Sequence, residues 1–258
     1  MKIERIKSKI IKLMRAPDEY RDLNDMINKE LLSKNIDKIS DLSQATILDC
    51  GCGNGNKLLS IKKSFPGFKE YKGIDNYLPA IKSCEKYLKS GLEFIYGDCL
   101  SMPIGDKSVD VIISNQVIEH ISQYEIYLKE LKRILKPEGI IILSTPNFHC
   151  PKNTILKMFG QEPILRWGNI DGKPPEDFRG HTQEFSEIEL IMLLKSHSFV
   201  IKDLIPILPC ITLNGNILFN LYSIAEYLLY KITKPFVEEG YSKNTNLVCS
   251  NYLNKVIF

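Results

Sequence analysis

Short apolar runs alternate with helix-period segments between Ala45 and Leu143, and this alternation is typical of βα units that wind a parallel sheet. We therefore expect an α/β fold in which helices cover both faces of the sheet. The predicted strands are 45–49, 71–75, 92–96, 109–114, 140–143, 199–204 and 246–250.

Helix boundaries are marked by capping signals. The second crossover helix is expected at 77–89. Ser122 and Glu125 have the spacing of a capping box and predict a helix that runs to the Pro-Glu-Gly sequence at 137–139. Ser186 and Glu189 repeat that spacing and predict a second capped helix, with a hydrophobic staple formed by the flanking apolar residues.

The remaining segments suggest additions to a sheet domain. We expect an N-terminal helical cap at 1–44, followed by one domain at 45–258 with insertions at 146–184 and 205–243. Residues 1–15 have the pattern of a basic amphipathic helix, and 217–230 have a wide apolar helical face. These two segments predict either packing or a peripheral membrane contact. The stretch 204–230 lacks the 18-residue apolar run of a transmembrane helix.

Composition excludes several classes of protein. The 258 residues include 34 Lys and Arg against 31 Asp and Glu, a net charge of +3, and 44% are hydrophobic. Neither a strongly basic nucleic-acid binder nor a disordered chain has this composition. Seven cysteines without a CxxC pair and four scattered histidines indicate neither a disulfide framework nor a zinc site. A cytoplasmic location is expected.

The first predicted strand enters a glycine-rich loop with glycines at 51, 53 and 55. Asn56 stands where a dinucleotide-binding loop places its third glycine, so a nicotinamide-dependent dehydrogenase is disfavoured. Asp49 ends the strand, where a carboxylate would repel pyrophosphate but attract an ammonium group. The loop therefore predicts a cationic ligand without phosphate.

S-adenosylmethionine (SAM) is a ligand of this kind. Asp75 ends the second predicted strand, where its carboxylate can accept hydrogen bonds from ribose hydroxyls. Asp98 follows the third strand and can accept from the adenine amino group. With Asp49, these acids lie at the carboxyl ends of three strands, the edge at which open α/β sheets bind ligands.

Five motifs in order resemble those of the class I SAM-dependent methyltransferases. They are ILDCGCGNG (47–55), GIDNY (73–77), GDCLSMP (97–103), VDVIISNQVIEHI (109–121) and LKRILKPEGIIILSTPN (131–147). The resemblance implies a Rossmann-like, seven-stranded, mostly parallel sheet with an antiparallel last strand. It implies that Asn115 and Gln116 lie beside the methionine part of SAM. The expected cofactor-binding residues are Asp49, Gly51, Cys52, Gly53, Asp75, Asn76, Asp98, Cys99, Asn115 and Gln116.

Within that family, STPN followed by GHTQEFS (180–186) is similar to the ubiquinone-biosynthesis-like branch, which methylates hydroxyls of small molecules. The acidic pair of metal-dependent catechol-type enzymes is missing, since Asn115 and Asn147 follow the fourth and fifth strands, so no metal is expected. The NPPY loop of enzymes that methylate nucleic-acid amino groups is also missing.

His181 and His120 are the candidate catalytic bases, with local turn hydrogen bonding or packing as the alternative for each. The predicted activity is methyl transfer to a small-molecule hydroxyl, on a sugar, a quinone-type compound or a lipid-linked metabolite. An RNA methyltransferase that uses the basic N-terminus and a non-catalytic SAM-binding module are the alternatives. Nucleic acid is not the expected partner, whereas a homodimer and membrane contact through 1–15 or 217–230 remain open.

Overall fold

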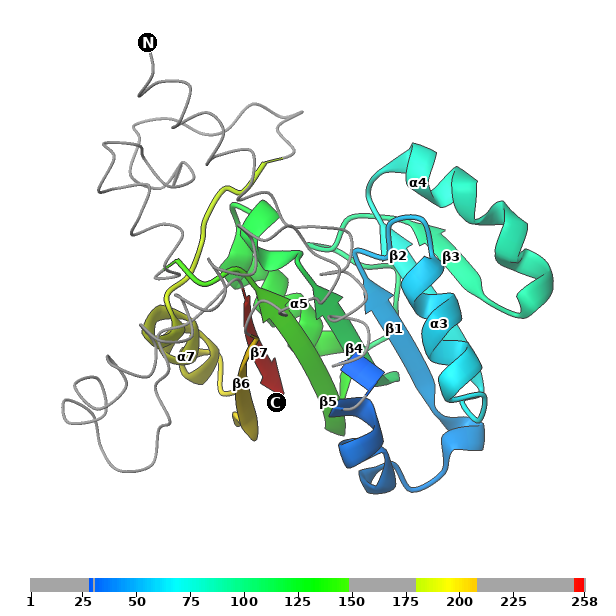
Figure 1. Cartoon of the computed structure of the whole chain (residues 1–258), viewed down its shortest axis with the longest axis horizontal. Helices are drawn as coiled ribbons and strands as arrows, with labels where there is room; N and C mark the ends of the chain where they lie inside the picture. Colours follow the sequence, from blue (N-terminus) through cyan, green and yellow to red (C-terminus); the bar gives the residue numbers. More distant parts are fainter. Residues whose placement is uncertain (1–27, 30, 149–179, 208–252, 258) are drawn as a thin grey trace, which may run out of the picture.

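The computed structural model describes residues 28–29, 31–148, 180–207 and 253–257 (Figure 1). Residues 28–29 and 31–35 are helical. The strands are β1 (Thr46–Cys50), β2 (Glu70–Asp75), β3 (Glu93–Tyr96), β4 (Val109–Asn115), β5 (Leu135–Thr145), β6 (Asp203–Ile207) and β7 (Leu253–Ile257). The α-helices are α3 (Asn56–Ser64), α4 (Leu78–Ser83), α5 (Tyr124–Ile134) and α7 (Glu187–Ser196). Short 3₁₀ helices are η1 (Ile36–Lys38), η2 (Leu42–Gln44), η3 (Cys84–Ser90) and η4 (Ile118–His120).

Five strands pair in parallel in the order β3-β2-β1-β4-β5. β1 lies at the centre, where Asp49 is in register with Gly73 of β2 and with Ile113 of β4. This arrangement confirms the predicted α/β, Rossmann-like class. Beyond β5 the sheet continues with β7 and then β6, and β7 is antiparallel to both of its neighbours.

Alternate residues of the central strands supply two hydrophobic cores, one on each face of the sheet. On β4, Ile112 belongs to the core that is completed by α5 and α7, whereas Val111 and Ile113 belong to the core completed by α3 and residues 31–32. β5 alternates in the same way. Because both faces are buried, these strands read as nearly continuous apolar runs, and helices cover both faces as expected (Figure 1).

The last two strands lie later in the sequence than predicted. β6 occupies Asp203–Ile207 instead of 199–204, and Phe199 and Val200 precede it. β7 occupies Leu253–Ile257, whereas the predicted 246–250 lies outside the described residues. Apolar sequence pattern alone does not fix where a strand begins and ends, because pairing with the neighbouring strands decides the boundaries.

The observed bounds of α5 show that its predicted N-terminal capping box and its predicted C-terminal end were both wrong. The helix begins at Tyr124 with Gln123 as its N-cap residue and no side-chain cap, so Ser122 lies one position too early to form a capping box with Glu125. It ends at Ile134 rather than near Pro137. Lys136 precedes Pro137, and a residue in that position disfavours the helical conformation. Residues 135–139 instead extend β5, which starts at Leu135, paired with Val109 of β4.

The other two predicted helices differ in outcome. The expected helix at 77–89 is divided into α4 and the 3₁₀ helix η3. α7 confirms its capping box: the Ser186 side chain accepts a hydrogen bond from the Glu189 backbone, and the Glu189 carboxylate accepts one from the Ser186 N–H at 2.8 Å. Phe185 and Leu190, the predicted staple residues, are both buried in the same core.

Several predicted features fall on segments outside the described residues. They are the basic segment 1–15, the apolar face 217–230, and most of the insertions at 146–184 and 205–243. Of the predicted cap at 1–44, the described part packs its Leu31 and Leu32 into the core on the α3 face. Within the described part of the chain, no helix combines the length and the apolar character needed to span a membrane.

Candidate functional site

A cavity of about 490 Å³ opens where the loops after β1, β2, β3 and β4 meet. Its volume lies in the range of small-molecule and cofactor sites. The residues that line it are Gly51, Asp75, Asn76, Asp98, Cys99, Leu100, Gln116, Val117, His120, Ile121 and Ser122. Seven of the residues predicted from the sequence thus meet at one edge of the sheet.

The loop between β1 and α3 is fixed to β2 by its backbone. The N–H groups of Gly51 and Cys52 both donate to the carbonyl of Ile74, at 2.8 and 3.0 Å. Gly51 has φ +71°, and a Cβ atom added to it would lie 2.5 Å from Cγ2 of Val117. Position 51 therefore needs glycine both for its left-handed backbone and for close packing against the loop after β4.

Asp75 is held rigidly at the end of β2. Its Oδ2 accepts a hydrogen bond from the Gly53 N–H at 2.9 Å, and its Oδ1 accepts one from the Tyr77 N–H at 2.8 Å. A carboxylate oxygen can accept more than one hydrogen bond, so this half-buried group can still bind a diol. The two N–H contacts orient the carboxylate at the cavity wall.

The loop after β3 contributes Asp98 and Cys99. Asp98 is exposed, and its Oδ1 accepts a hydrogen bond from the Leu100 N–H at 2.9 Å. Cys99 is buried, with its Sγ 3.3 Å from the Sγ of Cys50. Asp98 thus presents a carboxylate to the cavity from a loop whose base is anchored in the core.

Four predicted cofactor-binding residues are absent from the described lining of the cavity: Asp49, Cys52, Gly53 and Asn115. Asp49 is completely buried at the end of β1, and Cys52 packs against Gly73. Burial, with the nearby Asp49 carboxylate, raises the pKa of the Cys52 thiol well above its usual range. Gly53 acts on the cavity through its hydrogen bond to Asp75.

Asn115 and Gln116 follow β4 in different environments. Asn115 is buried, and its Oδ1 accepts a hydrogen bond from the Ser144 hydroxyl. Gln116 lines the cavity with φ +56°, and its N–H donates to the Ser144 carbonyl at 2.9 Å. The left-handed backbone at Gln116 turns the chain from β4 toward η4, where His120 reaches the cavity.

The two predicted bases, His120 and His181, lie together despite their separation in the sequence. Their ring centroids are 4.8 Å apart, with the rings in a T-shaped arrangement. His120 Nδ1 lies 3.1 Å from the Gly180 carbonyl, and His181 Nδ1 lies 3.0 Å from Oε1 of Glu184. His120 lines the cavity and is the better placed of the two to meet a ligand there.

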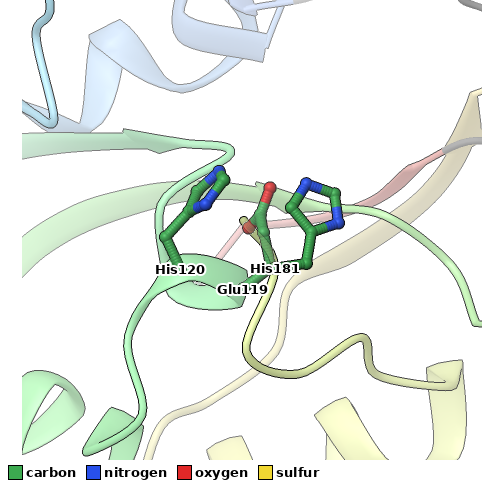
Figure 2. A group of neighbouring side chains, drawn as sticks. All are labelled: Glu119, His120 and His181. Atoms are coloured by element: carbon green, nitrogen blue, oxygen red, sulfur yellow. The ribbon is translucent and has the colours of Figure 1, made fainter. Parts of the chain in front are cut away.

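Glu119 completes this pair and was not predicted from the sequence. Figure 2 shows its carboxylate between the two imidazole rings, with Glu119 and His120 on one turn and His181 on the facing segment. Glu119 is fully buried, and burial raises its pKa to about 7. The only sequence signal was an acid placed directly before His120 in an otherwise apolar run at 117–121.

Backbone hydrogen bonds attach the segment at 180–186 to the turn that carries Glu119. The N–H groups of Thr182 and Gln183 donate to the Glu119 carbonyl at 2.7 and 3.2 Å, and the Phe148 N–H donates to the Phe185 carbonyl at 3.0 Å. Residues 180–184, predicted as the end of an insertion, are therefore attached to the turn that carries His120 at the cavity.

The arrangement fits SAM, whose positive charge and ribose diol suit a cavity lined by Asp75 and Asp98. A metal was not expected because the acids that follow strands four and five in catechol-type enzymes are missing. Glu119, His120 and His181 nevertheless form a group whose ligand atoms all lie within 4.8 Å of one another. This group lies on η4 and the segment 180–186, away from the positions on which that expectation was based.

Sequence comparisons identify relatives of this chain. The family model described as "Methyltransferase domain" matches residues 48–143. A ubiquinone biosynthesis O-methyltransferase of Rickettsia bellii is 30% identical over 191 residues, which cover 69% of this chain and 72% of that protein. A malonyl-[acyl-carrier protein] O-methyltransferase of Xylella fastidiosa is 30% identical over 135 residues, 50% of this chain and 45% of that protein.

The chain spans less than two thirds of some curated relatives, including 60% of the ubiquinone biosynthesis O-methyltransferase of Rickettsia conorii. Solved structures agree in fold. A protein from Pyrococcus horikoshii superposes with a TM-score of 0.57 at 18% identity, covering 93% of this chain and 91% of that one. A SAM-dependent methyltransferase described as putative, from Listeria monocytogenes, also gives 0.57, at 17% identity, covering 87% and 94%.

The strand-end acids, the glycine loop and the parallel sheet agree with these comparisons. The chain belongs to the class I SAM-dependent methyltransferases, and its cofactor is S-adenosylmethionine.

Proposed function

We propose that this protein transfers the methyl group of SAM to a hydroxyl oxygen of a small molecule, such as a sugar, a quinone-type compound or a lipid-linked metabolite. The observation that carries the proposal is that one cavity joins Asp75 and Asp98 to His120. Acids suited to the cofactor thus lie at one part of the wall and a candidate base at another. Relatives named as O-methyltransferases support an oxygen acceptor.

Each residue at the cofactor part of the cavity has a proposed role. Asp75 accepts hydrogen bonds from the ribose hydroxyls, with Asn76 beside it, and Asp98 accepts from the adenine amino group. Gly51 lets backbone approach the cofactor, and Gln116 lies toward the methionine part. Asp49 sets the negative potential at the end of β1, which favours the methionine ammonium group. Cys52, Gly53, Cys99 and Asn115 support this wall.

When bound, SAM supplies an activated methyl group on a sulfonium sulfur, so much of the rate can come from holding the acceptor oxygen in line and excluding water. His120 or His181 then takes the acceptor proton. The Gly180 carbonyl can only accept a hydrogen bond, so the nearby His120 Nδ1 carries the proton of that pair and its Nε2 is the basic nitrogen. The same tautomer is proposed at His181, whose Nδ1 lies 3.0 Å from Oε1 of Glu184.

Calorimetric titration with SAM tests the cofactor assignment. We expect Asp75→Ala to weaken SAM binding by roughly 10- to 100-fold, the worth of hydrogen bonds to a charged group. Asp37→Ala, which removes an exposed acid from η1, is the matched control and should bind like the wild type. Unchanged binding in Asp75→Ala would contradict the assignment.

The acceptor is tested separately, by mass spectrometry of metabolite extracts incubated with methyl-labelled SAM. We expect label on an oxygen of a small molecule. Label on RNA, together with salt-sensitive RNA binding that is lost on deleting residues 1–15, would instead support an RNA methyltransferase. SAM binding without transfer to any extract would support a non-catalytic module.

Further parts of the proposal concern segments that lie wholly or partly outside the described residues. The division into a cap at 1–44 and a domain at 45–258 with insertions at 146–184 and 205–243 stays a prediction. Contact of 1–15 or 217–230 with a membrane surface, and pairing of two copies of the chain, also stay predictions. The insertions are where we expect the acceptor to be selected, since the first of them carries His181 near its end.

A further inference from the structure

Glu119, His120 and His181 form a compact group of nitrogen and oxygen donors at the wall of the cavity. Each offers one ligand atom, and all three atoms lie within 4.8 Å of one another. Three protein ligands around Zn²⁺, at about 2.0–2.2 Å from the ion, would be roughly 3.3–3.6 Å apart. Side-chain movements of about an ångström would therefore bring the three ligand atoms to these distances. Figure 2 shows the carboxylate of Glu119 between the two imidazole rings.

Both histidines are oriented by a neighbour in the way that metal-binding histidines usually are. His120 Nδ1 lies 3.1 Å from the Gly180 carbonyl, and His181 Nδ1 lies 3.0 Å from the Glu184 carboxylate. Such outer contacts hold the proton on one ring nitrogen and make the other nitrogen the metal ligand. They thus assign Nε2 of each ring to the ion.

The Glu119 carboxylate is also held by a neighbour through one of its two oxygens. Oε2 of Glu119 accepts a hydrogen bond from the Thr145 hydroxyl at 3.1 Å. Oε1 is buried and has no hydrogen-bond partner among the residues that the structure describes. A buried carboxylate oxygen in that state costs free energy unless it is protonated or meets a cation.

We propose that Glu119, His120 and His181 bind one divalent transition-metal ion, for which Zn²⁺ is the reference probe. Two imidazoles and one carboxylate are donors that suit Zn²⁺, Fe²⁺, Co²⁺ or Mn²⁺, whereas Mg²⁺ and Ca²⁺ prefer oxygen. Three protein ligands leave coordination positions open, and His120 places them toward the cavity.

The ion would fasten the segment 180–186 to η4, since Glu119 and His120 come from one and His181 from the other. The inference deepens the proposed function at the same site, because it gives the acceptor part of the cavity a cation. With the ion bound, the histidines are ligands and not bases. The acceptor hydroxyl would then lose its proton to solvent water, helped by the charge of the nearby ion.

Metal binding by the full chain tests the inference without SAM or an acceptor. Chelator-treated protein is titrated with Zn²⁺ by calorimetry and with Co²⁺ by visible absorption, and we expect one ion per chain and a Co²⁺ spectrum of nitrogen and oxygen ligation. His120→Asn, His181→Asn and Glu119→Gln should each weaken binding by at least about tenfold. Glu184→Gln should weaken it by roughly 10- to 100-fold, as changes to outer contacts do.

His197→Asn is the matched control, because His197 caps the end of α7 and bonds to the Leu193 carbonyl at 2.9 Å. It should bind Zn²⁺ like the wild type. His120 is exposed, so its variant should keep the wild-type melting temperature without metal. Wild-type affinity in His120→Asn and His181→Asn, or an equal loss in His197→Asn, would overturn the inference.

SAM titration of the wild-type chain separates the two proposals. SAM binding by a wild-type chain that does not bind Zn²⁺ would contradict the metal site alone. Zn²⁺ binding by a chain that does not bind SAM would contradict the proposed function alone.

Discussion

Gly51 shows how closely the cofactor loop is packed at the residue scale. Its φ of +71° is shared in sign by Gly53, at +52°, so either position strains an added side chain. The two differ in their surroundings. A Cβ at position 51 would lie 2.5 Å from Cγ2 of Val117, whereas a Cβ at position 53 would have no atom within 4 Å.

This difference predicts unequal effects of two alanine substitutions. Gly53→Ala should lower the free energy of unfolding by about 1–2 kcal/mol through backbone strain alone. Gly51→Ala should cost roughly 1–3 kcal/mol more, because the buried, β-branched Val117 has little freedom to move aside. Urea denaturation of the two variants checks this order, and equal losses would show that the loop after β4 yields to the added methyl group.

At the scale of single elements, α7 and α5 begin in different ways although both carry the Ser-x-x-Glu spacing. Ser186 caps α7 in a complete capping box. Ser122 is exposed and lines the cavity, one position before the N-cap residue of α5. The stability of α7 should therefore depend on its serine, and that of α5 should not.

Replacing each serine by alanine tests that distinction. Ser186→Ala should lower the free energy of unfolding by about 1 kcal/mol, the usual worth of an N-cap. Ser122→Ala should change it by less than about 0.5 kcal/mol, as for an exposed residue without a cap role. Thermal or urea unfolding of both variants provides the comparison, and a similar loss at Ser122 would indicate that α5 is capped as the sequence pattern suggests.

At the scale of the whole molecule, an ion pair within α5 anchors the loop after β3 through hydrogen bonds to the backbone of that loop. Oε1 of Glu130 accepts a hydrogen bond from the Met102 N–H at 2.6 Å, and Oε2 accepts one from Nε of Arg133 at 2.7 Å. Arg133 also donates to the carbonyl groups of Met102 and Ile104, at 3.1 and 2.9 Å. The hydrogen bond from Arg133 lowers the pKa of Glu130 below its ordinary value of 4.5.

This pair predicts a pH-dependent contribution to stability. Since the pKa of Glu130 is lower in the folded chain, its carboxylate stabilises the fold above pH 4.5, and the stabilisation is lost as the pH falls through the folded pKa. Glu130→Gln should destabilise the chain by roughly 1–3 kcal/mol at pH 7. The difference from wild type should shrink under acid conditions.

Unfolding by urea at a series of pH values measures this difference. Glu125→Gln is the control, because Glu125 is exposed on the same helix and should show little change at any pH. A loss in Glu130→Gln that stays constant into the acid range would show that size or packing, and not charge, is responsible.

The order of elements and the meeting of the strand-end acids at one cavity were predictable from the sequence because they depend on local signals. Apolar runs marked the parallel strands, and the acids at strand ends fell on one edge of the sheet because parallel strands end on the same side. Asp75, Asp98 and Gly51 therefore met at the cavity as expected. Asp49 was correctly placed at a strand end, but its complete burial was not foreseen.

Only the tertiary structure decided which distant residues meet. Glu119 and His181 are separated by more than sixty positions, and the backbone of Thr182 and Gln183 brings them together by donating to the Glu119 carbonyl. Nothing in the local pattern of either segment encodes that contact. The predicted capping box at Ser122 does not form, because the preceding turn at η4, and not the local sequence, sets where α5 begins. Sequence thus determined the scaffold and the cofactor, and long-range packing decided the Glu119, His120 and His181 group.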